Sequence, residues 1–162
     1  MKIGIIVHSH TGNTYSVAKR LEEMLVSIGH EIKIEKLEPV DEEGTLKGNY
    51  NLVSQPDLSG YETLIFAAPV WGFNISGLMK NYMTNISTLK DKKVMCFITK
   101  GLFVNGFGGM RSINKIIEIT TAKGGEFKGY GIVCWKEKKR EELIKGLLEK
   151  FRGILDESAE QL

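Results

Sequence analysis

The chain has 162 residues, of which 42% are hydrophobic and 26% charged, and its formal net charge is +2. This length corresponds to one domain with a buried core, which we expect to extend over residues 1–162. No apolar run approaches the roughly 20 residues that span a bilayer, and the basic residues are spread along the chain. We therefore expect neither a membrane nor nucleic acid as a partner, and the sequence does not indicate an oligomeric state.

The only two cysteines, Cys96 and Cys134, each lie inside an apolar stretch. A free thiol behaves as a small hydrophobic group, so both positions suit buried strands. The alternative, a disulfide or redox pair between them, has no C-x-x-C spacing to support it. Two unpaired thiols are typical of a reducing compartment, and we expect a cytoplasmic protein.

Five segments have the pattern of β-strands. Three of them are continuously apolar, which is typical of strands covered on both faces in a parallel sheet. A fourth, residues 31–37, alternates between polar and apolar side chains, as a half-exposed edge strand does, and residues 129–135 supply the fifth. The three continuous segments are residues 3–7, 63–70 and 94–98.

Segments with helical spacing of apolar residues follow the first, third, fourth and fifth strands. This alternation predicts an α/β fold with a doubly wound sheet and right-handed crossovers. Residues 41–60 differ, because Gly, Asn, Pro and Ser are frequent where a helix would be expected. We expect a long loop there with at most a short helix, and loops of that length are often functional.

A turn rich in hydroxyl and amide groups lies between the first strand and its helix. In an open α/β sheet, ligands bind beyond the carboxyl ends of the strands, where the strand order reverses. Free N–H groups, the helix dipole and side-chain donors together favour an anion at this turn. The alternative, helix capping alone, would need only two such residues. The turn consists of Ser9, His10, Thr11, Gly12, Asn13 and Thr14.

Several phosphate chemistries are excluded by what this turn lacks. It has neither the G-x-x-x-x-G-K-S/T pattern of a P-loop nor the G-x-G-x-x-G pattern of a dinucleotide fold. His8 and Pro69 stand where a receiver domain would have acidic residues, and the cysteine and arginine of a phosphatase turn are absent. The turn is therefore expected to hold a phosphate without attacking it. We expect His8 and His10 to hydrogen-bond near that phosphate rather than to bind a metal ion.

The positions of Ser9, Thr11, Gly12 and Thr14 match the pattern Ser/Thr-x-Thr-Gly-x-Thr, with which flavodoxins bind phosphate. On this motif and the order of elements, nearly the whole chain resembles the flavodoxin family. The resemblance implies a flavodoxin-like three-layer αβα sandwich with a five-stranded parallel sheet of order 2-1-3-4-5. It also implies flavin mononucleotide (FMN) as a non-covalent cofactor, bound at the point where the strand order reverses.

Two further loops are implied as contacts of the flavin ring. In the loop after the third strand, the resemblance assigns Trp71 and Phe73 as stacking residues and the backbone at Gly72 as a partner for the ring edge. The alternative is that the two aromatic side chains close the end of the core. The candidate residues of this loop are Pro69, Val70, Trp71, Gly72, Phe73 and Asn74.

The loop at residues 99–109 contains four glycines, which predicts a close approach of its backbone to a ligand, although a mobile surface loop is the alternative. Many flavodoxins have acidic residues and a tyrosine here. In this chain the charged residue is Lys100, and the aromatic residues are Phe103 and Phe107. The candidates for cofactor contact are Thr99, Lys100, Gly101 and Gly106.

Lys100 bears on the kind of electron transfer. A cation near N1 of the ring would stabilise the anionic, two-electron-reduced flavin, whereas a lysine that faces solvent would not, and the sequence leaves both orientations open. Two functions therefore remain: an electron-transfer flavoprotein that serves a redox partner protein, and an NAD(P)H-dependent quinone or FMN reductase. A partner-binding domain without flavin is disfavoured by the intact phosphate turn. We predict no catalytic acid or base and no metal site.

Overall fold

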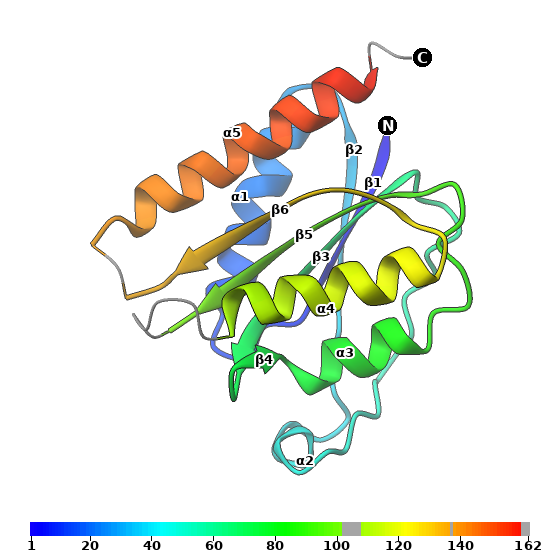
Figure 1. Cartoon of the computed structure of the whole chain (residues 1–162), viewed down its shortest axis with the longest axis vertical. Coiled ribbons are helices and arrows are strands. Elements are labelled where there is room, and N and C mark those ends of the chain that lie inside the picture. Colours follow the sequence, from blue (N-terminus) through cyan, green and yellow to red (C-terminus); the bar gives the residue numbers. More distant parts are fainter. Residues whose placement is uncertain (102–107, 137, 160–162) are drawn as a thin grey trace.

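The computed structural model describes residues 1–101, 108–136 and 138–159, and Figure 1 shows the arrangement of its elements. Five long parallel strands form the middle layer in the order β2-β1-β3-β5-β6. Counted along the chain, these strands have the predicted order 2-1-3-4-5, so the predicted fold is confirmed. The strands are β1 (Lys2–Val7), β2 (Glu31–Lys36), β3 (Thr63–Trp71), β5 (Lys93–Lys100) and β6 (Glu126–Cys134).

The sheet also contains a sixth, short strand that the sequence did not predict. β4 (Asn74–Ile75) pairs antiparallel with the end of β3, so Trp71 lies opposite Asn74. Between them, Gly72 and Phe73 have φ values of 55° and 65°. Positive φ at both central residues is what a two-residue hairpin turn of type I′ requires. The expected loop after the third strand is therefore the tip of a hairpin, because β3 continues to Trp71 before the chain folds back.

Helices cover both faces of the sheet (Figure 1). α1 (Asn13–Ser27) and α5 (Arg140–Ala159) share a core with one face, while α3 (Gly77–Thr84) and α4 (Gly109–Ala122) share a core with the other. The interior strand β1 illustrates why such a strand is continuously apolar. Ile5 joins the α1/α5 core and Ile6 joins the α3/α4 core, and both side chains are fully buried. Burial of each such side chain contributes about 1.5–3 kcal/mol.

The segment between β2 and β3 contains only the short helix α2 (Glu42–Leu46), as predicted. A bridge between Pro39 and Leu52 closes the base of this excursion, which exposes Val40 and Val53 on its surface. The segment is therefore a compact excursion beside β2 rather than a covering helix.

The two thiols are buried, and no disulfide joins Cys96 to Cys134. Burial raises the pKa of the Cys96 thiol, so this group remains protonated at neutral pH. No helix in the described part of the chain is long and apolar enough to cross a bilayer.

Candidate functional site at the carboxyl edge of the sheet

The phosphate turn lies at the carboxyl end of β1 and leads directly into α1. Ser9 Oγ accepts a hydrogen bond from the Tyr15 backbone N–H at 3.1 Å, which fixes the turn against the first turn of the helix. Gly12 has a φ of 90°, a left-handed conformation that favours glycine. A Cβ placed on Gly12 would have no described atom within 4 Å. The turn therefore presents its backbone to open space.

The backbone N–H groups of residues 10–14 have no hydrogen-bond acceptor among the described residues. Helix N-termini leave such N–H groups unpaired, and they carry the positive end of the helix dipole. Unpaired N–H groups at a helix N-terminus, beside open space at Gly12, are typical of an anion-binding turn. The turn thus fits the phosphate that the sequence analysis assigned to it.

Thr14 is the one member of the predicted phosphate motif that lies in the interior. Its hydroxyl is within 2.7 Å of the Thr99 hydroxyl, and both side chains are buried. This hydrogen bond joins the first turn of α1 to the end of β5, so two predicted site residues from distant parts of the sequence meet. The contact fixes the phosphate turn against the end of β5.

Trp71 lies between the end of β1 and the phosphate turn. Its ring packs edge-on against two histidines, with centroid distances of 5.1 Å to His8 and 5.6 Å to His10. Phe73, at the hairpin tip, is instead 56% exposed. The two aromatic candidates therefore differ: Trp71 is partly covered within the edge, and Phe73 presents most of its surface to solvent.

His8 is the most unusual polar group at this edge. Its side chain is 1% exposed, its Nδ1 lies 2.8 Å from the hydroxyl of Ser76, and its Nε2 has no hydrogen-bond partner within the described residues. Burial lowers the pKa of His8 to about 4; nearby Glu42 opposes this shift and His10 adds to it. At neutral pH the imidazole is therefore uncharged, and one of its nitrogens remains unpaired beside Trp71.

The sequence analysis did not identify Ser76 or Glu42 as part of this edge. Ser76 directly follows β4, which places its hydroxyl against His8. Glu42 begins α2, and its carboxylate lies 3.3 Å from Nδ1 of His10. Neither residue belongs to a local motif, and both contacts depend on how the hairpin and the excursion fold back.

The loop after β5 approaches the hairpin. A Cβ placed on Gly108 would lie 2.8 Å from Cα of Phe73, so only glycine permits this contact. Lys100 is partly exposed, and its Nζ lies near the start of α4, 3.8 Å from a Cβ placed on Gly109. Gly106, Phe103 and Phe107 lie outside the described residues.

Taken together, this edge contains a row of unpaired N–H groups, an aromatic hairpin and a glycine-rich loop. Among the described residues, no group of three or more His, Cys, Asp or Glu side chains could hold a metal ion. The arrangement suits an anionic ligand that carries an aromatic ring. FMN has these two parts, and the described residues fit it at the phosphate turn and the hairpin.

No protein-family model matches the chain, and no curated protein is significantly similar in sequence. Solved structures do match. The flavodoxin of Fusobacterium nucleatum bound to flavin mononucleotide has a TM-score of 0.68 at 16% identity, covering 96% of this chain and 98% of that chain. The Trp repressor binding protein of Bacillus subtilis has a TM-score of 0.68 at 18% identity, with 92% and 99% covered.

Oxidised flavodoxin 2 of Bacillus cereus has a TM-score of 0.64 at 21% identity, with 94% of this chain and 99% of that chain covered. These similarities extend over nearly the full length of each chain, while the identities are low. They establish the architecture independently of the motif. The chain has the flavodoxin-like α/β fold.

Proposed function

We propose that this protein binds FMN non-covalently and transfers electrons through it. The observation that carries the proposal is the row of unpaired N–H groups at residues 10–14, beside open space at Gly12. This row lies at the carboxyl edge between strands whose order reverses, where α/β folds bind nucleotides. The similar structure from Fusobacterium nucleatum, which is described as bound to flavin mononucleotide, supports the same ligand.

Each part of the edge has a role in this proposal. The phosphate turn binds the phosphate through backbone N–H groups and the hydroxyl of Thr11. Trp71 and the hairpin cover the ring and exclude water. FMN supplies the redox chemistry when bound, so no protein acid or base is needed. The physiological partner would be a redox protein that docks at this edge.

The phosphate contact gives the first test. Purified protein should bind FMN more tightly than riboflavin, because only FMN carries the phosphate. Loss of one hydroxyl donor to a charged phosphate should cost roughly 1.5–3 kcal/mol, so Thr11→Ala should weaken FMN binding about tenfold or more. Isothermal titration with both ligands measures this. Ser87→Ala, an exposed hydroxyl at the opposite end of the sheet, is the control and should bind FMN like the parent protein.

Equal affinity for FMN and riboflavin would refute the role of the phosphate turn. A fluorescence titration with FMN tests Trp71, whose emission should be quenched on FMN binding. Trp135, at the end of β6, provides the comparison. Equal quenching in the parent protein and in Trp71→Ala would show that Trp71 does not contact the ring.

A second candidate function is an NAD(P)H-dependent quinone or FMN reductase. The observation that favours it is Lys100, a cation at the carboxyl edge beside the start of α4. A positive charge near the reduced ring favours two-electron chemistry. Rapid anaerobic reduction of the FMN-bound protein by NADH or NADPH, followed by turnover of a quinone, would support the reductase. Reduction only by a protein partner would support the electron carrier.

A further inference from the structure

A hollow adjoins the phosphate turn. It has a volume of about 560 Å³ and lies between the turn at residues 9–12 and the segment at residues 36–39, with Glu42 and Val53 completing its wall. Small-molecule sites fall in the range of about 300–1,000 Å³. The hollow is on the β2 side of the turn, whereas the hairpin and the loop after β5 are on the β3 and β5 side. His10 lines this hollow and also packs against Trp71, so the hollow adjoins the space assigned to the flavin ring on its β2 side.

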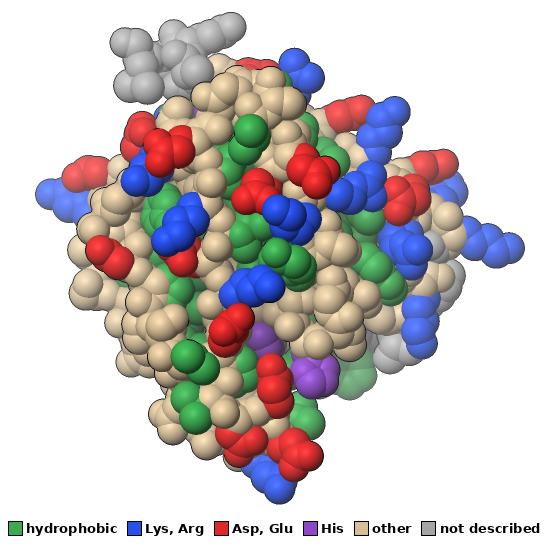
Figure 2. Space-filling model, turned by 180° about the vertical axis from the view of Figure 1, so that it is seen from behind, with side chains coloured by type: hydrophobic (Ala, Val, Ile, Leu, Met, Phe, Trp, Pro, Cys, Tyr) green, Lys and Arg blue, Asp and Glu red, His purple; other side chains and the backbone are tan. Residues whose placement is uncertain are grey.

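The side chains around this hollow combine three kinds of contact. The ring of Tyr15 lines it, and Nζ of Lys36 lies 4.0 Å from the centroid of that ring. Two carboxylates, Glu38 and Glu42, also line it, together with apolar groups that include Val53. Figure 2 shows acidic and hydrophobic side chains around the histidines in the lower part of the molecule. An aromatic and apolar wall, the ammonium of Lys36 and two carboxylates thus line one hollow, and the carboxylate of Glu42 also lies 3.3 Å from Nδ1 of His10.

These contacts match the parts of an adenylate. An adenine ring packs on aromatic and apolar surface, and a phosphate pairs with an ammonium group. Carboxylates accept hydrogen bonds from the two ribose hydroxyls. Glu38 lies two residues after the end of β2, and the pairing of Val7 with Lys36 brings that strand end beside the phosphate turn.

We propose that this hollow binds an adenylate, the adenine, ribose and phosphate unit of a dinucleotide, directly beside the phosphate turn. The inference rests on the proposed function, because the flavin phosphate would occupy the shared turn. The adenylate has two sources. It is the adenosine end of flavin adenine dinucleotide (FAD), whose flavin half then takes the site proposed for FMN, or the adenosine end of NADH bound beside FMN.

Filling the hollow provides the decisive variant. Val53 is 65% exposed on the excursion, so Val53→Trp adds a large side chain at the wall without disturbing a buried core. Val26→Trp is the matched control, since Val26 is 53% exposed and lies near the far end of α1. Glu38→Gln removes one carboxylate charge. AMP is titrated into each protein, with and without saturating FMN, and followed by amide chemical shifts.

We expect AMP to shift the amides of residues 36–39 and of Tyr15. Its affinity should fall at least tenfold in Val53→Trp and several-fold in Glu38→Gln, and remain unchanged in Val26→Trp. Absence of AMP binding, or equal binding by Val53→Trp and Val26→Trp, would overturn the inference. Tighter binding by Glu38→Gln would do so too, because the carboxylate would then repel the phosphate instead of binding the ribose.

The FAD and FMN affinities distinguish the two sources. If the adenylate belongs to FAD, FAD binds at least tenfold more tightly than FMN, and Val53→Trp removes that advantage without changing FMN binding. If the adenylate belongs to NADH, FAD binds no more tightly than FMN, and oxidised NAD competes with AMP for the FMN-loaded protein. Failure of FMN to bind would refute the proposed function, whereas failure of AMP to bind would refute only this inference.

Discussion

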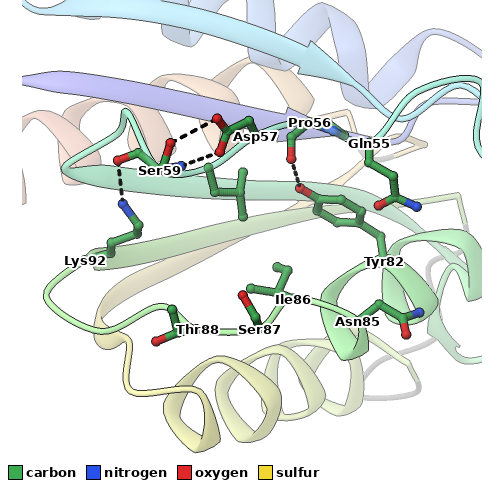
Figure 3. Close-up of a pocket in the computed structure, with 11 residues that line it drawn as sticks. Gln55, Pro56, Asp57, Ser59, Tyr82, Asn85, Ile86, Ser87, Thr88 and Lys92 are labelled. Carbon is green, nitrogen blue, oxygen red and sulfur yellow. Dashed lines mark hydrogen bonds between the residues drawn. The ribbon is translucent and has the colours of Figure 1, made fainter.

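Each end of the sheet has a hollow, and the two ends differ in how their polar groups form hydrogen bonds. At the amino end, a hollow of about 290 Å³ lies between the loop at residues 55–59, the end of α3 and the loop before β5 (Figure 3). Tyr82 Oη donates to the carbonyl of Pro56 at 3.2 Å, and Nζ of Lys92 donates to the carbonyls of Ser59 and Tyr61. These groups satisfy one another.

At the carboxyl end, the polar groups point to a ligand instead. The N–H groups of residues 10–14 have no acceptor in the described part of the chain, and Nε2 of His8 is buried without a partner there. Unpaired polar groups cost free energy unless a ligand or water satisfies them. At the amino end, Oγ1 of Thr63 at the start of β3 is also buried without a partner among the described residues. The contrast between the two ends therefore lies in the backbone N–H groups of residues 10–14, which leave the carboxyl end able to bind a ligand.

The largest expected effect concerns His8. Its pKa is about 4 in the folded protein and 6.5 in an unfolded chain, so the neutral form stabilises the fold above pH 6.5. As the pH falls from 6.5 towards 4, the unfolded state takes up a proton that the folded state does not. The free energy of unfolding should therefore fall by about 3 kcal/mol over this range. Denaturant unfolding at several pH values measures it.

His8→Phe should remove most of that pH dependence, because phenylalanine fills the buried position without titrating. His30→Asn is the comparison at the amino end. Burial also lowers the pKa of His30, but this side chain is only partly buried. Its replacement should therefore leave most of the pH dependence of the unfolding free energy. An unchanged slope in His8→Phe would show that His8 is not the group responsible.

The second prediction compares two glycines at opposite ends of α1. Gly12 and Gly29 have φ values of 90° and 93°, and neither would place a Cβ within 4 Å of a described atom. Replacement of either glycine by alanine should therefore lower the free energy of unfolding by about 1–2 kcal/mol, because a left-handed backbone conformation disfavours a Cβ. Only Gly12→Ala also places a methyl group over the phosphate turn. The affinity of the Gly12→Ala variant for FMN should fall at least tenfold, whereas the Gly29→Ala variant should bind FMN like the parent protein.

Thermal unfolding and FMN titration of both variants check this prediction. Equal FMN affinities would show that the backbone of Gly12 does not approach the ligand. Unequal losses of stability would show instead that the two turns are not equivalent in strain, and the FMN comparison would then need correction for the unfolded fraction.

The layout of the fold was largely predictable from the sequence because it rests on local patterns. Continuous apolarity identified β1, β3 and β5, since each of these strands is covered on both faces. The motif from Ser9 to Thr14 indicated the turn whose backbone N–H groups have no acceptor among the described residues. The short α2 in the excursion was also expected from the frequent glycine and asparagine there.

The contacts that the sequence did not predict depend on distant segments. The hairpin at Gly72 and Phe73 requires a positive φ at a phenylalanine, a conformation that local propensity disfavours. The contact of His8 with Ser76 joins residues 68 positions apart, and that of Thr14 with Thr99 joins residues 85 positions apart. Such pairings follow from the packing of the strands, so no local pattern could have revealed them.

The third prediction compares two lysines at the two ends of β5. If Nζ of Lys100 lies near N1 of bound FMN, Lys100→Met should destabilise the two-electron-reduced flavin by about 1–2 kcal/mol after desolvation is subtracted. The potential of the second electron should then fall by a few tens of mV, since about 59 mV corresponds to 1.4 kcal/mol. Anaerobic redox titration measures it. Lys92→Met, at the amino end, should leave the potential unchanged.

An unchanged potential in Lys100→Met would place the ammonium away from the ring and remove the charge argument for a reductase. A loss of stability without a shift in potential is expected of Lys92→Met, because its ammonium donates to two backbone carbonyls. The two variants thus separate an electrostatic role at the carboxyl end from a structural role at the amino end.

The smallest effect concerns Tyr82, whose hydroxyl is part of the self-satisfied network at the amino end. Tyr82→Phe removes the hydrogen bond to the carbonyl of Pro56 and keeps the buried ring. The free energy of unfolding should fall by about 0.5–1.5 kcal/mol, the net contribution of one such bond. FMN affinity should not change, because the proposed flavin site is at the other end of the sheet. Denaturant unfolding and FMN titration test both statements, and a weaker FMN affinity with unchanged stability would reverse the roles assigned to the two ends.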